Sequence, residues 1–133
     1  APTHSNPKRL NHSRHVNGPY HVHQQSMDPL EAIRLVRAAG GVPVVAHPMS
    51  EERGPALPLE YLGQMAEAGL AGVEVYHREN SEPNRARLLE FARERELLVT
   101  GSSDYHGAGK PNQLGEYTTS RETVEAIRAQ ISR

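Results

Sequence analysis

A short polar stretch near the carboxyl terminus combines residue types that bind metal ions or transfer protons. Residues 97–101 form an apolar run of strand length, and the turn after it presents Asp104 and His106, a carboxylate and an imidazole two positions apart. Two other apolar runs also end in histidine, at His47 and His77. Loops beyond the carboxyl ends of parallel strands hold the chemistry of α/β folds, so these side chains form a candidate site.

The residue types of this site favour a divalent metal. The chain has no cysteine, so a metal would be held by His, Asp or Glu, and such ligands suit Zn, Mn or Fe. We expect His47, Asp104 and His106 to bind it, because three ligands with an open position can lower the pKa of a bound water toward ~7. The alternatives are a structural histidine at His47 and an Asx-turn at Asp104.

Three further side chains could bind an anionic substrate. His77 and Arg78 follow the second strand, and an imidazole beside a guanidinium suits a phosphate; the alternative is a solvated pair on a loop. Lys110 follows a Gly-Ala-Gly turn and could reach the same anion, or be an ordinary loop lysine. Glu74 lies inside a strand, where an acid needs a partner, so it could hydrogen-bond a ligand residue.

Length and composition limit the function classes. With 133 residues the chain is one domain or part of a larger one. A net charge of -1 gives no electrostatic basis for tight binding of duplex nucleic acid. No apolar run approaches the ~20 residues of a membrane span. There is no signal-like apolar segment at the start, so we expect a cytoplasmic protein without membrane contact.

The first 27 residues differ from the rest. They hold five of the eight histidines and no acidic residue, and their polar composition cannot offset the entropy of ordering. We therefore expect residues 1–27 to be an extended or disordered linker segment, and residues 28–133 to be the folded part. His21 and His23 have the alternating spacing of a metal pair on a strand, but their surroundings are polar and unpatterned.

Residues 28–133 show helical and strand patterns in alternation. Three short apolar runs predict strands, the first of them buried on both faces. The predicted helices span 28–39, 58–68, 81–96 and 119–131, and the predicted strands span 42–46, 72–76 and 97–101. We expect the inward face of the first helix to consist of Leu30, Ile33, Leu35, Val36 and Ala39. The last helix should begin at Thr119 or Ser120, with Glu122 closing a capping box on Thr119. The fold class is α/β with a parallel sheet.

Three sequence stretches together resemble a known family. GGVPVVAHP, GVEVYHREN and LLVTGSSDYHGAGKPNQLGEYTT are similar to the C-terminal half of PHP-domain (polymerase and histidinol phosphatase) metal-dependent phosphoesterases. The resemblance is strongest to the branch that hydrolyses nucleoside 3',5'-bisphosphates or trims the 5' ends of short RNA. It implies a partial (βα)7-type barrel, here with three main strands and four helices.

The resemblance also implies roles for the candidate residues. It makes His47, Asp104 and His106 ligands of divalent Mn, Zn or Fe, with Asp104 and His106 in the catalytic centre. It places His77 and Arg78 beside the substrate phosphate. The implied reaction is hydrolysis of a phosphate ester by metal-activated water, with a small phosphorylated nucleotide or short RNA as substrate.

Several elements of that family are absent from this chain. The family begins with a His-x-His strand and an aspartate and adds a further histidine and glutamate, and no counterpart precedes residue 47. We therefore expect a fragment of a hydrolase, with exposed strand edges open to self-association. The alternatives are a catalytically incomplete half-domain with weak metal or anion binding, and a histidinol-phosphate-type phosphatase.

Overall fold

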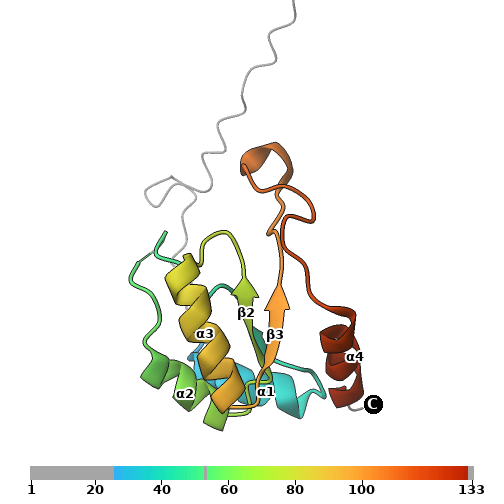
Figure 1. Cartoon of the computed structure of the whole chain (residues 1–133). Coiled ribbons are helices and arrows are strands. Elements are labelled where there is room, and N and C mark those ends of the chain that lie inside the picture. Colours follow the sequence, from blue (N-terminus) through green and yellow to red (C-terminus); the bar gives the residue numbers. More distant parts are fainter. Residues whose placement is uncertain (1–25, 53, 132–133) are drawn as a thin grey trace, which may run out of the picture.

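The computed structural model describes residues 26–52 and 54–131, and shows helices alternating with parallel strands (Figure 1). The predicted segment 1–27 and its histidines lie almost wholly outside the described residues. The elements are α1 (Pro29–Ala38), β1 (Val44–Val45), α2 (Leu59–Glu67), β2 (Gly72–Tyr76), α3 (Glu82–Glu94), β3 (Leu98–Gly101), the 3-10 helix η2 (Gly107–Gly109) and α4 (Arg121–Gln130). The predicted α/β fold class is confirmed. None of the described helices is both long and apolar enough to cross a membrane.

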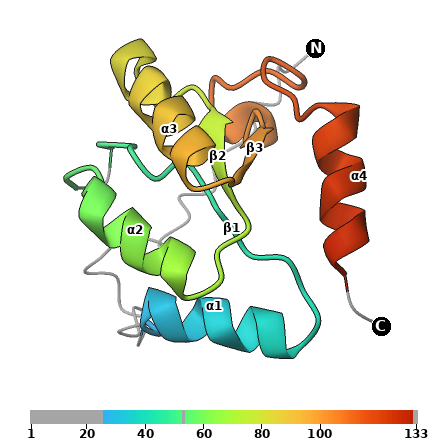
Figure 2. The same cartoon turned by 60° about the horizontal axis from the view of Figure 1, so that its bottom comes forward.

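The three strands form a parallel sheet in the order β1-β2-β3. Val45, Val73 and Val99 are aligned across the strands and so share one face of the sheet. All three belong to the hydrophobic core, which α1, α2 and α3 complete. The fully buried side chains of Leu62 and Leu88 anchor α2 and α3 there. Turned by 60°, the structure shows α4 beside β3, apart from the other three helices (Figure 2).

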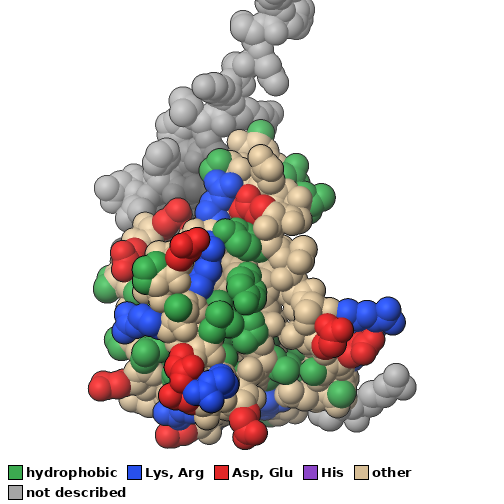
Figure 3. All heavy atoms as spheres, in the orientation of Figure 1, with side chains coloured by type: hydrophobic (Ala, Val, Ile, Leu, Met, Phe, Trp, Pro, Cys, Tyr) green, Lys and Arg blue, Asp and Glu red, His purple; other side chains and the backbone are tan. Residues whose placement is uncertain are grey.

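Two expectations about the first helix and strand are wrong. The strand predicted over 42–46 is only two residues long and half-buried, because β1 has a strand partner on one side only among the described residues. Ile33 is buried as predicted, where α1 contacts α2, but Leu35 and Val36 of the same predicted stripe are exposed. The middle of the face seen in Figure 1 also displays grouped hydrophobic side chains (Figure 3). The described part of the chain therefore exposes apolar side chains that the sequence pattern places in the core.

The capping of the last helix also differs from the prediction. Ser120, not Thr119, is the N-cap of α4, and its hydroxyl accepts a hydrogen bond from the Thr123 N–H at 3.1 Å. Thr119 instead binds the end of β3, since its hydroxyl accepts a hydrogen bond from the Gly101 N–H at 3.0 Å and donates one to the Gly101 carbonyl at 2.8 Å. These two bonds attach the end of the long loop that follows β3 to the strand itself.

We expect that position 101, where Thr119 binds β3, has no room for a side chain. A Cβ there would lie 2.6 Å from the Thr118 carbonyl oxygen and 2.8 Å from the Tyr76 Cβ. Gly101→Ala should therefore lower the free energy of unfolding by about 1–3 kcal/mol, the usual cost of overpacking, as measured by urea denaturation. Gly109→Ala is the control, because nothing lies within 4 Å of its added Cβ. Equal stability of the two variants would contradict the packing at Gly101.

Candidate active site at the carboxyl ends of the strands

The loops after the three strands meet beyond the same edge of the sheet (Figure 1). The loop after β1 carries His47, the loop after β2 carries His77 and Glu79, and the loop after β3 carries Asp104. Two groups of potential ligand atoms form there, each with all atoms within 4.8 Å of one another. One consists of His47, Glu74 and His77, and the other of His77, Glu79 and Asp104.

The backbone is strained at two of these positions. His47 has φ 27° and Asp104 has φ 49°, values in the left-handed region that few residues other than glycine adopt. Such conformations persist where the surrounding structure imposes them, and they cluster at functional sites. The strain therefore supports a functional role for both predicted ligands.

Glu74 holds the first and third loops together. Its buried carboxylate accepts hydrogen bonds from the His47 backbone N–H at 2.8 Å and from the Ser102 hydroxyl. The predicted partner for this acid within a strand is therefore the backbone of a ligand residue, together with a serine. Both carboxylate oxygens are used by these bonds, so we interpret Glu74 as a residue that positions His47.

His77 is fully buried between the two groups of ligand atoms. Its Nδ1 accepts a hydrogen bond from the Glu79 N–H at 3.1 Å, and its ring centroid lies 4.6 Å from that of His47. A neutral imidazole that accepts at Nδ1 carries its proton on Nε2. This Nε2 is buried without a hydrogen-bond partner among the described residues. His77 therefore offers an unused N–H donor, which suits an anion better than a metal.

Asp104 and Glu79 surround a positive charge. The Lys110 ammonium forms an ion pair with Asp104 and lies 4.0 Å from a carboxylate oxygen of Glu79. The hydrogen bond from Lys110 lowers the pKa of Asp104, and the Ser50 hydroxyl, followed by the charge of His47, lowers the pKa of Glu79. Both acids are thus ionised near neutral pH, and the geometry already holds a cation between them.

Two predicted site residues lie apart from this cluster. His106 is 54% exposed, and its Nδ1 lies 2.6 Å from the Asp104 carbonyl oxygen and 3.3 Å from the Asp104 carboxylate. It belongs to neither group of ligand atoms. Arg78 pairs with Glu116 at 2.8 Å and 3.0 Å, so in this structure its guanidinium is held by a carboxylate rather than free for phosphate.

Sequence reasoning missed two residues of this site. Glu79 follows a strand end by three residues, as Asp104 does, and that shared spacing could have identified it. Asn80 is fully buried, and its side chain bonds to the Met49 N–H and to the carbonyls of Glu74 and Val75. Nothing in its local sequence distinguishes this amide from that of a surface loop.

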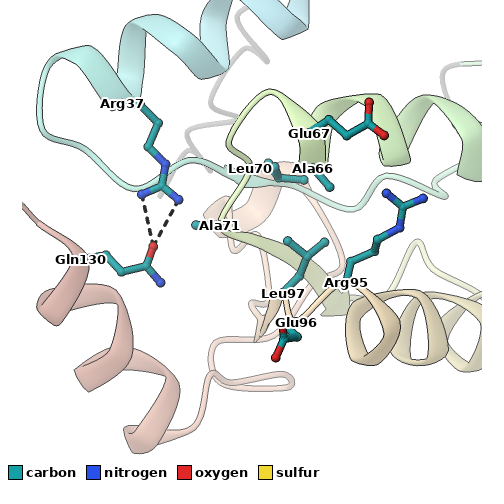
Figure 4. A pocket seen from close by; sticks show the side chains of 9 residues that line it. All are labelled: Arg37, Ala66, Glu67, Leu70, Ala71, Arg95, Glu96, Leu97 and Gln130. Atoms are coloured by element: carbon teal, nitrogen blue, oxygen red, sulfur yellow. Dashed lines mark hydrogen bonds between the residues drawn. The ribbon is translucent and has the colours of Figure 1, made fainter.

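A second hollow, of about 310 Å³, lies at the opposite end of the sheet (Figure 4). The Arg37 guanidinium points toward Gln130 there, and also donates to the Gly69 carbonyl at 2.7 Å. Arg95 lines the same hollow, and Glu67 and Glu96 balance the two positive charges. Its two positive and two negative charges therefore cancel, unlike the charges of the carboxyl-end cluster.

Comparison with known proteins supports a phosphoesterase-like half-domain. No protein-family model matches the sequence. A phosphoribosyl 1,2-cyclic phosphate 1,2-diphosphodiesterase of Eggerthella lenta is 37% identical over 81 residues, which are 61% of this chain and 29% of that protein. A provisionally assigned metal-dependent phosphoesterase of Bifidobacterium adolescentis superposes with a TM-score of 0.82 at 42% identity, over 90% of this chain and 42% of that one.

An amidohydrolase of Chromobacterium violaceum, solved with bound sulfate, shares the fold. Its TM-score is 0.61 at 24% identity, over 88% of this chain and 42% of that chain. This chain thus spans less than half the length of each of these three proteins. The predicted resemblance to a PHP-like phosphoesterase half-domain is confirmed in sequence and in fold.

Proposed function

Because the chain resembles half of a PHP-type metal-dependent phosphoesterase, we propose that it forms part of a site that hydrolyses phosphate esters. The observation that carries the proposal is the pairing of a cation position with a buried, unused N–H donor. Asp104 and Glu79 hold the positive charge of Lys110, and His77 Nε2 lies buried nearby with no acceptor in the part of the chain that the structure describes. A phosphate ester bound to a divalent cation matches both features, because the cation fits the position between the two acids and a phosphate oxygen can accept the N–H of His77.

The residues present fit a divalent ion. Asp104 and Glu79 belong to one group of ligand atoms, and Glu79 lies 3.6 Å from the Nδ1 of His47, which belongs to the other group. These three residues, from the loops after β3, β2 and β1, would hold the ion, and their mixture of imidazole and carboxylate suits Mn, Zn or Fe. His106, on the same loop as Asp104, is a further ligand implied by the resemblance. A bound ion would neutralise charge on the phosphate oxygens and lower the pKa of a water molecule.

The other side chains of the site act on the phosphate itself. His77 donates its Nε2–H to a phosphate oxygen, and burial makes this bond stronger than it would be in water. Lys110 supplies a positive charge from the loop after β3. Arg78 joins them only if Glu116 releases it, so we assign it a smaller share of the binding.

The substrates we propose are small phosphorylated nucleotides or ribose phosphates. The resemblance favours nucleoside 3',5'-bisphosphates or short RNA 5' ends, and the name of the Eggerthella relative adds a cyclic phosphate of phosphoribose.

We also propose that the outer edge of β1 is the contact for self-association. A molar mass that stays monomeric at high concentration in light scattering would contradict that contact.

The test is binding and turnover of adenosine 3',5'-bisphosphate with and without Mn²⁺. We expect binding that needs the metal and that His77→Ala weakens about tenfold or more, the effect of losing one hydrogen bond to a charged group. The matched control is His106→Ala, on the exposed rim, which should affect Mn²⁺ affinity more than nucleotide affinity.

Three outcomes of this test differ in meaning. Metal-dependent release of phosphate supports the enzyme. Binding without turnover supports the catalytically incomplete half-domain instead. Absence of metal-dependent binding would overturn the phosphate site altogether. Phosphoribosyl 1,2-cyclic phosphate and histidinol phosphate, tested in parallel, distinguish the substrate classes.

A further inference from the structure

We infer that Lys110 is a displaceable internal cation, which occupies the metal position and is released toward the substrate when a divalent ion enters. The inference rests on the proposed function and adds a coupling between metal and substrate binding. Such a coupling means that binding of the metal ion moves the Lys110 ammonium into the phosphate-binding site before the phosphate binds.

The first observation is where the ammonium lies. Lys110 contacts the Asp104 carboxylate, a predicted metal ligand, and its Nζ is 4.0 Å from the Glu79 carboxylate. Its side chain is 25% exposed, while that of Glu79 is 9% exposed, so the contact is shielded from solvent screening. It is also the only lysine among residues 26–52 and 54–131. Two ionised acids would otherwise repel each other there, and the ammonium offsets that repulsion.

The second observation is that the ammonium and a metal cannot share this position. A divalent ion on Asp104 would lie within a few ångströms of Nζ, and like charges at that distance repel strongly in a partly buried site. Lys110 is the mobile partner, because its charge is at the end of a flexible four-carbon stem. Asp104, by contrast, is fixed by its strained backbone at φ 49°.

The third observation is that the loop allows the movement. Lys110 directly follows η2 (Gly107–Gly109), and nothing lies within 4 Å of a Cβ built at either of the two glycines. The same loop carries Asp104 beside His77 and its unused N–H donor. The released ammonium therefore remains close to the place where the phosphate would bind.

We expect substitution of Lys110 to change the affinities for metal and for nucleotide in opposite directions. Lys110→Met should tighten Zn²⁺ binding about tenfold, because no resident cation has to be expelled. It should weaken binding of adenosine 3',5'-bisphosphate to the Zn²⁺-loaded protein by a similar factor, because the anion loses its ammonium. Arg121→Gln is the matched control for charge, since Arg121 is exposed and pairs only with Glu125 on α4. It should change neither affinity.

Calorimetry measures both affinities, and NMR of ¹³Cε-labelled lysine follows the displacement. The chain has only two lysines, Lys8 and Lys110, and Lys110→Met identifies the Lys110 signal. We expect Zn²⁺ to shift and sharpen that signal as the ammonium is released. Zn²⁺ binding that leaves the signal and the Lys110→Met affinity unchanged would overturn the inference alone. Failure of Zn²⁺ to bind either protein would overturn the proposed function with it.

Discussion

Asp104→Asn is expected to abolish the binding of Mn²⁺ to this chain. Asparagine keeps the shape of the side chain and tolerates the left-handed backbone at φ 49°, so the loop should keep its conformation. It removes the negative charge on which both the ion pair with Lys110 and the metal position depend. Loss of a residue that hydrogen-bonds a metal ligand typically costs about 10–100-fold in metal affinity, so loss of a ligand itself should cost more than about 100-fold.

Isothermal titration of the metal-free protein measures this effect. Asp28→Asn is the matched control, because Asp28 is the only other aspartate in the chain and lies at the start of α1. It should bind Mn²⁺ like the wild type. If Asp104→Asn binds as tightly as Asp28→Asn, the metal lies elsewhere or is held without the loop after β3.

Asn80→Ala is expected to produce the largest loss of stability among the polar residues of the site. The side chain is fully buried and links the loop after β1 to the end of β2 through three hydrogen bonds. Alanine leaves the Met49 N–H and the Glu74 carbonyl without this partner, whereas the Val75 carbonyl still accepts from the His77 N–H at 3.0 Å. Each unsatisfied buried group costs about 1–3 kcal/mol. We expect the free energy of unfolding to fall by about 3 kcal/mol.

Urea denaturation measures this change, with Asn84→Ala on α3 as the control. The backbone N–H of Asn84 donates a hydrogen bond to the hydroxyl of Ser81, the N-cap of α3, and alanine retains this bond. We expect a change within about 0.5 kcal/mol for this variant. Similar losses for both variants would show that Asn80 does not fix the relative position of the two loops.

The parts of the fold that sequence reasoning predicts well are those with a continuous local pattern. Residues 72–76 match β2, whose first four residues are buried and which pairs with a strand on each side. The run at 42–46 is more apolar, but Pro43 has no N–H to donate and β1 pairs on one side only among the described residues, so the strand is shorter. Edge position is a property of the sheet, and the local pattern does not contain it.

In the candidate site, too, the sequence predicts some features and not others. The strand-end rule predicts that the loops with His47, His77 and Asp104 meet, because parallel strands deliver their following loops to one edge, and the structure brings these residues into two adjoining groups of ligand atoms. Spacing could not show that the His106 side chain turns back to its own loop, or that Glu116 pairs with Arg78. Both facts depend on how the long loop after β3 folds over itself, and no repeating pattern encodes that path.

The central claim is that the carboxyl end of this sheet holds a divalent ion between the loops after β1 and β3. Anomalous X-ray scattering from crystals grown with Zn²⁺ tests it most directly. The account predicts a zinc peak about 2.0–2.2 Å from the Asp104 carboxylate and from a ring nitrogen of His47, with the Lys110 ammonium withdrawn. A peak only at surface side chains, with Lys110 still on Asp104, would contradict it.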